Sequence, residues 1–136
     1  MPDMRKMRPH AEPRFNSDVP ETIGEGNRLV AEALGAAGWE TGLFGKWHLG
    51  DSPEYYPQNR GFDVNIGGWS RGGPYTGNKY FAPFKNPEIK IESPEGDHLP
   101  ARLARETARF IADNKDQPFL AYLSFYSVHT PLMGRP

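Results

Sequence analysis

The first regular hydrophobic pattern along the chain lies between residues 22 and 37. Thr22 followed by Glu25 has the spacing of a capping box, which marks a helix start, and Gly38 stands where many helices end. One face of the expected helix carries apolar side chains at helical spacing: Val30, Ala33, Leu34 and Ala37. Because glycines within the segment weaken a helix, we expect it to need a sheet to lie on.

Two short apolar runs predict strands. Residues 39–44 form the first, which ends at Gly45, and residues 119–125 form a nearly continuous apolar run that fits a strand buried on both faces. A second helix is predicted over residues 100–114, because one helical face gathers Leu99, Leu103, Thr107, Phe110 and Ile111. Helices that alternate with buried strands favour an α/β fold, with a parallel sheet flanked by helices.

Two segments show no sustained period. Residues 1–20 contain four prolines and are predicted to form an irregular arm. Residues 51–99 contain seven glycines and six prolines and are predicted to form a long Gly/Pro/aromatic-rich loop. The many aromatic side chains of this loop argue against disorder.

Composition narrows the possible functions. With 16 basic and 17 acidic residues, the net charge of −1 argues against nucleic acid or an anionic membrane as partner. The absence of Cys excludes a disulfide, a thiolate metal site and a Cys nucleophile within this chain. No apolar run is long enough to span a membrane, and the N-terminus does not resemble a signal peptide. A chain with 15 Gly, 14 Pro and 37% apolar residues would struggle to close a core alone, which suggests a part of something larger.

Candidate chemistry follows the two predicted strands. Lys46 and His48 come directly after the first strand, and His129 follows the second. Ligands of parallel sheets bind beyond the carboxyl ends of the strands, so these residues are candidates for one site. If the segment is extended, Lys46 and His48 point to one side. A cation beside two imidazoles suits an anionic group and the protons that move with it, although a structural role for each loop histidine is the simpler alternative.

Three segments in order carry a family resemblance. Residues 38–50, GWETGLFGKWHLG, resemble the second signature of the type I, formylglycine-dependent sulfatases. Residues 59–63, NRGFD, resemble the segment that usually comes next. Residues 118–125, PFLAYLSF, and 128–131, VHTP, resemble a later strand of that family and its histidine loop. The chain is therefore similar to an internal fragment of the N-terminal catalytic domain, and residues 1–136 are interpreted as a partial domain of this kind.

The resemblance implies an alkaline-phosphatase-like α/β fold, here incomplete, and hydrolysis of small-molecule or glycan sulfate esters, as in arylsulfatases. In that family a formylglycine, made within C/S-x-P-x-R, is the nucleophile, and a Ca²⁺ ion is held by Asp and Asn residues. By position, Lys46 would bind the sulfate and the oxygen of the nucleophile. His48 would hydrogen-bond the formylglycine diol, and His129 would contact the sulfate and the leaving oxygen. Members of the family are often periplasmic or secreted, but this sequence sets no localisation.

The sequence departs from the family pattern at the nucleophile and the metal. No C/S-x-P-x-R occurs, and the Asp and Asn residues that hold the metal are expected before residue 1 and after residue 136 of a full-length member. We therefore expect that the chain alone does not turn over sulfate esters. Two alternatives remain open: a fragment of a related phosphomonoester or phosphonate hydrolase, and a short non-catalytic protein that binds sulfated glycans.

Substrate specificity is expected to depend on the 51–99 loop and on parts outside the chain. Arg71 and Lys79 lie in this loop. A solvated loop charge is the simpler interpretation of each, and contact with a sugar or aryl group of the substrate is the alternative.

Overall fold

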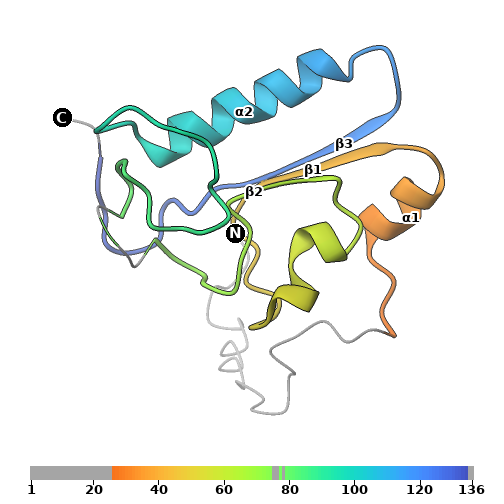
Figure 1. The fold of residues 1–136 in the computed structure, drawn as a ribbon, viewed down its shortest axis with the longest axis horizontal. Helices are drawn as coiled ribbons and strands as arrows, with labels where there is room; N and C mark the ends of the chain where they lie inside the picture. Colours follow the sequence, from red (N-terminus) through yellow and green to blue (C-terminus); the bar gives the residue numbers. More distant parts are fainter. Residues whose placement is uncertain (1–25, 75–76, 78, 135–136) are drawn as a thin grey trace, which may run out of the picture.

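The computed structural model describes residues 26–74, 77 and 79–134. The predicted arm over residues 1–20 and the Thr22/Glu25 capping box lie outside the described residues. The elements along the chain are α1 (Val30–Ala36), β1 (Glu40–Gly45), the 3₁₀-helices η2 (Pro53–Tyr55) and η3 (Pro57–Asn59), β2 (Val64–Ile66), α2 (Leu99–Asp113) and β3 (Phe119–Ser124) (Figure 1).

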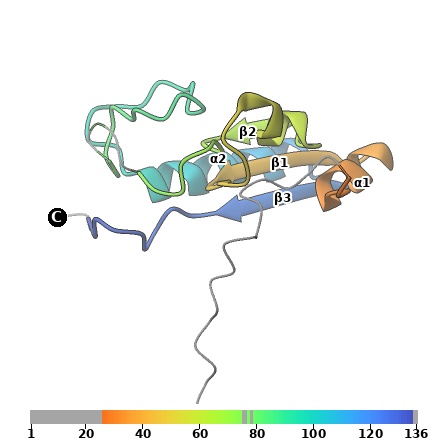
Figure 2. The same cartoon turned by 90° about the horizontal axis from the view of Figure 1, so that it is seen from below.

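The three strands form one parallel sheet in the order β2-β1-β3, as the alternation of helices and strands predicts. Gly42 of β1 pairs with Val64 of β2 on one edge and with Ala121 of β3 on the other. The strands run in the same direction, and the segment between β2 and α2 lies beyond their carboxyl ends (Figures 1 and 2). The prediction of a long irregular loop over residues 51–99 missed β2, because three residues are too few to show a period.

Alternation along β1 builds a core on each face of the sheet. Leu43 is fully buried with Ala31 of α1 and Phe62 on one face. Phe44, its neighbour, packs on the opposite face within a cluster that also contains Leu99, Leu103 and Phe110 of α2. Successive side chains of a strand point to opposite faces, so this single strand anchors a helix on each side. The described chain contains no helix that could cross a membrane.

The first helix differs from its prediction. α1 begins at Val30, and the Glu32 carboxylate accepts a hydrogen bond from the Leu29 backbone N–H at 2.8 Å, which satisfies an amide at the helix start. The short helix turns Ala31 into the core and leaves Val30 61% exposed, so the predicted stripe is wrong at that position. Gly38, with φ of 84°, terminates the helix in the left-handed region as expected.

Strand β3 is less buried than predicted. Its side chains Tyr122 and Leu123 are 48% and 37% exposed, which contradicts burial on both faces. Among the described strands, β3 pairs with β1 alone and forms an edge of the sheet. The apolar run therefore predicts the strand correctly, but the described part of the chain leaves these two side chains partly exposed. In contrast, α2 buries its predicted stripe at Leu99, Leu103, Thr107 and Phe110 and leaves Ile111 exposed.

Candidate functional site

Lys46 begins the loop that leaves β1, and the end of β3 holds its backbone. The Lys46 N–H donates a hydrogen bond to the Ser124 carbonyl oxygen at 2.7 Å. Gly45 makes this approach possible, because its φ is 112° and any β-carbon there would overlap the same Ser124 carbonyl. The loops after β1 and β3 therefore start side by side at the carboxyl edge of the sheet.

His48 occupies an unusual backbone conformation two residues later. Its φ is 59°, in the left-handed region that non-glycine residues seldom adopt. The backbone at His48 is therefore not extended, so the condition under which Lys46 and His48 were predicted to point to one side is not met. The His48 N–H donates to the Trp69 carbonyl oxygen at 3.1 Å, and Gly72 lies so close to the imidazole that any β-carbon would overlap it. The 67–73 segment thus fixes His48.

His129 is held by its own loop and by a tyrosine. Its N–H donates to the Tyr126 carbonyl oxygen at 2.9 Å, and its Nδ1 lies 2.7 Å from the Thr130 carbonyl oxygen. A carbonyl can only accept, so a hydrogen bond here requires the tautomer that carries its proton on Nδ1. The Tyr80 hydroxyl lies 2.9 Å from the carbonyl oxygens of both Tyr126 and His129.

Tyr126 connects the loops that follow β2 and β3. Its hydroxyl donates to the Gly67 carbonyl oxygen at 2.6 Å, and the Asn86 amide donates to the same oxygen at 2.8 Å. Burial raises the pKa of the Tyr126 hydroxyl, which therefore stays protonated and serves as a structural donor. Neither Tyr80 nor Tyr126 was singled out by sequence reasoning, because an aromatic residue in a loop carries no local signal of a distant carbonyl partner.

Within the described residues, no hydrogen bond or ion pair joins the side chains of the three predicted site residues. Within the described residues, the Lys46 ammonium and the His48 ring make no hydrogen bond or ion pair. His129 lines a cavity of about 280 Å³ that includes neither of them. That cavity does include His98, whose ring lies 5.1 Å from that of Phe81 and whose Nε2 is buried without a partner in the described chain. Sequence analysis assigned no role to His98.

Trp47, which lies between Lys46 and His48, has a packing role. Its indole N–H donates to the Tyr55 carbonyl oxygen at 2.8 Å, and its ring meets Phe62 edge-on at 5.9 Å. This packing secures the loop against the α1 side of the sheet.

The described residues do not fit the metal centre or the nucleophile that the resemblance implies. Residues 26–74, 77 and 79–134 contain no group of three or more His, Cys, Asp or Glu side chains that could hold a metal ion. The sequence also contains no Cys and no C/S-x-P-x-R segment. No catalytic step through Ca²⁺ or formylglycine can therefore be derived from these residues.

Comparison with known proteins identifies the family. The family model for sulfatases matches residues 5–134. The chain belongs to the sulfatase family. A sulfatase of Schizosaccharomyces pombe, named as uncharacterized, is 32% identical over 119 residues, which are 77% of this chain and 22% of that protein. An arylsulfatase of Hemicentrotus pulcherrimus is 30% identical over 124 residues, which are likewise 77% of this chain and 22% of that protein. Human arylsulfatase G reaches 53% identity over 38 residues, which are 28% of this chain and 7% of that protein.

Solved structures agree with this sulfatase assignment. The crystal structure of Ps i-CgsB superposes with a TM-score of 0.60 at 28% identity, covering 79% of this chain and 28% of that one. The same protein in complex with k-i-k-neocarrahexaose superposes with a TM-score of 0.59 at 27% identity, covering 85% and 31%. The α/β fold expected from the sequence is therefore confirmed, and the chain spans about a fifth of the length of the Schizosaccharomyces pombe and Hemicentrotus pulcherrimus relatives.

Proposed function

We propose that this chain supplies the anion-binding part of a sulfatase catalytic domain, and that Lys46, His48 and His129 bind the sulfate ester. One observation carries the proposal. The Lys46-Trp47-His48 segment leaves the central buried strand at the carboxyl edge of the sheet, and the Lys46 N–H is bonded to the end of β3, the strand that leads to His129. This edge is where α/β sheets bind ligands.

Each residue has a role that its chemistry supports. The Lys46 ammonium is a compact charge that can bind sulfate oxygens. The hydrogen bond to the Thr130 carbonyl favours the tautomer of His129 that is protonated on Nδ1. Its Nε2 is then the ring nitrogen that would hold or release a proton at the leaving oxygen. His48 is locked by Trp69 and Gly72, which suits a group that must keep one position relative to the anion.

On this proposal the chain alone binds sulfate but does not hydrolyse its esters. The support is chemical: the sequence offers no formylglycine precursor, and the described residues offer no donor set for Ca²⁺. The nucleophile and the metal would then come from other parts of a complete sulfatase. The substrate of the complete protein would be a small-molecule or glycan sulfate ester.

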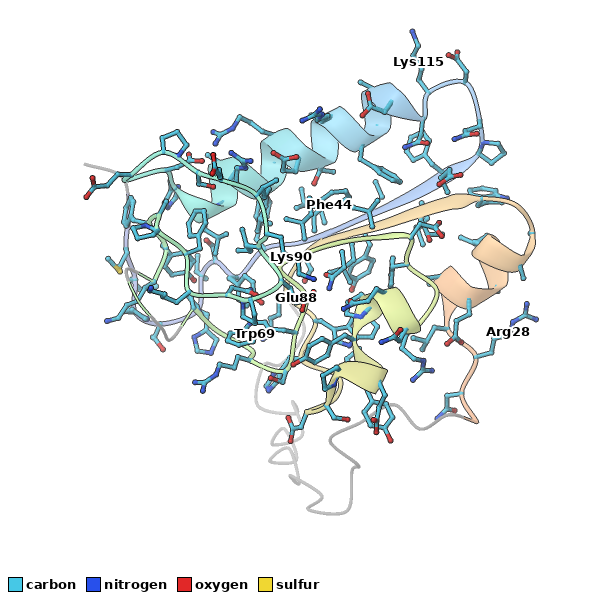
Figure 3. All side chains as sticks on the ribbon, in the orientation of Figure 1. Arg28, Phe44, Trp69, Glu88, Lys90 and Lys115 are labelled. Carbon is cyan, nitrogen blue, oxygen red and sulfur yellow. The ribbon has the colours of Figure 1, made fainter. Side chains whose placement is uncertain are left out.

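Titration calorimetry with inorganic sulfate tests the binding claim. We expect Lys46→Ala to abolish the binding that the full chain shows. Lys115→Ala is the matched control, because Lys115 is an exposed lysine in the turn between α2 and β3, at the opposite end of the sheet (Figure 3). Equal losses in both variants, or none in either, would show that Lys46 is not a sulfate ligand.

An assay with 4-nitrophenyl sulfate tests the claim that the chain is catalytically incomplete. We expect no turnover above the uncatalysed rate. A measurable rate that His48→Ala abolishes would overturn this part of the proposal, and hydrolysis of 4-nitrophenyl phosphate instead would favour a phosphomonoester hydrolase.

A further inference from the structure

The segment that fixes His48 also carries an exposed cation. Trp69 lies in the loop that leaves β2 (Figure 3), and its carbonyl oxygen accepts the His48 N–H at 3.1 Å. Gly72 lies directly against the His48 imidazole. Arg71 is the residue next to Gly72, so its side chain starts one residue away from this contact. The position of Arg71 is therefore coupled to that of a proposed anion-binding residue.

Arg71 is held in place by stacking. Its guanidinium carbon lies 5.6 Å from the centre of the Trp69 ring, within cation–π range. The Trp69 ring is itself partly buried and packs against the core cluster of Phe44 and α2. An arginine stacked in this way loses little further freedom on binding, and the N–H groups at the edge of its plane remain available for a planar or tetrahedral anion.

The local charge favours an anion at this position. Within the described chain, Arg71 forms no ion pair with an acidic side chain, unlike Arg60, Arg102 and Arg105. Lys79 is exposed and lines a small cavity that Trp69 also lines.

We propose that Arg71, stacked on Trp69, binds a second anionic group of the substrate, so that the site is built for oligosaccharides that carry another sulfate close to the one bound by Lys46 and His48. This inference rests on the proposed function. A guanidinium can bind two oxygens of a sulfate at once, and such charge-assisted pairs are stronger than neutral hydrogen bonds. A substrate with a single sulfate would engage Lys46 and leave Arg71 without a ligand.

Two matched carbohydrates test the proposal. Tryptophan fluorescence of the full chain is titrated at low ionic strength with κ-neocarrabiose, which carries one sulfate, and with ι-neocarrabiose, which carries two. We expect Arg71→Ala to weaken binding of the disulfated sugar about five- to tenfold and to leave the monosulfated sugar within twofold. Arg71→Lys should recover part of the loss, because it keeps the charge without the planar fork.

The controls separate this inference from the proposed function. Arg109→Ala removes an equal charge from the exposed face of α2 and should change neither affinity. Lys46→Ala should weaken both sugars. If Lys46→Ala weakens both while Arg71→Ala affects neither, or both equally, the second-sulfate role is wrong and the proposed function stands. If neither sugar binds, or Lys46→Ala changes nothing, the proposed function fails and this inference fails with it.

Discussion

The ion pair between Glu32 and Arg60 should stabilise the fold more than any surface pair. The Arg60 Nε lies 2.8 Å from the Glu32 carboxylate, and the Arg60 guanidinium also donates to the Asn27 carbonyl oxygen at 2.9 Å. The side chains are 8% and 29% exposed. The second Glu32 oxygen accepts the Leu29 N–H, so one carboxylate joins the start of α1 to the turn before β2.

The magnitude follows from the bonds that each substitution removes. Arg60→Met removes the charge-assisted hydrogen bonds to Glu32 and to the Asn27 carbonyl from a mostly buried site and should lower the free energy of unfolding by about 2–3 kcal/mol. Glu32→Gln keeps the shape but not the charge and should lower it by about 1–2 kcal/mol. The double variant should lose about 1.5 kcal/mol less than the sum of the two, because the residues lie in one network.

A double-mutant cycle by urea denaturation of the full chain measures this coupling. The control cycle uses Arg109 and Asp113, a helical pair at 4.0 Å whose side chains are 77% and 70% exposed. Its coupling should stay below about 0.5 kcal/mol. If the Glu32–Arg60 coupling is no larger than that of the control pair, the reasoning from burial and geometry is refuted.

The same pair predicts a pH dependence. The hydrogen bond from Arg60 holds the pKa of the Glu32 carboxyl below its usual value, with help from the Leu29 N–H. A lowered pKa in the folded state means that the stabilisation is fully present above the unfolded value of about 4.5 and is lost as the pH falls through the folded value. Glu32→Gln should remove this acidic part of the stability profile.

Three further outcomes are expected. Gly45→Ala should lower the free energy of unfolding by about 3 kcal/mol in a urea titration, because the new methyl group overlaps the carbonyl at the end of β3. Gly38→Ala, at a left-handed position in open space, should lower it by only about 1 kcal/mol. Tyr80→Phe should cost about 1–2 kcal/mol and broaden the His129 ring signals in NMR spectra, because the loop loses its hydroxyl anchor. The open edge of β3 should cause concentration-dependent self-association in sedimentation velocity, and Leu123→Lys should reduce it; a monomer at all concentrations would contradict the edge argument.

The elements with a long or regular pattern could be predicted from the sequence. The stripe of α2 and the apolar runs of β1 and β3 depend on local spacing, and Gly38 marks the end of α1 through its own backbone preference. The start of α1 could not be predicted, because its first amide is satisfied by Glu32, whose carboxylate is in turn held by the distant Arg60. Strand β2 owes its existence to pairing with β1 rather than to its own three residues.

Part of the candidate site could also be predicted from local sequence patterns. Strand ends predict that Lys46 and His129 lie at one edge of the sheet; the structure bonds the Lys46 N–H to the end of β3, the strand that leads to His129. The left-handed conformation of His48 could not be foreseen, because it depends on Trp69 and Gly72 from another loop. That the three side chains share one anion stays a prediction.

Nuclear magnetic resonance of the histidine rings, recorded while sulfate is added to the full chain, tests the central claim most directly. If Lys46, His48 and His129 bind one anion, the ring signals of both histidines shift along the same saturation curve, and Lys46→Ala abolishes the shifts. Signals that do not move, or shifts that persist unchanged in Lys46→Ala, would contradict the account.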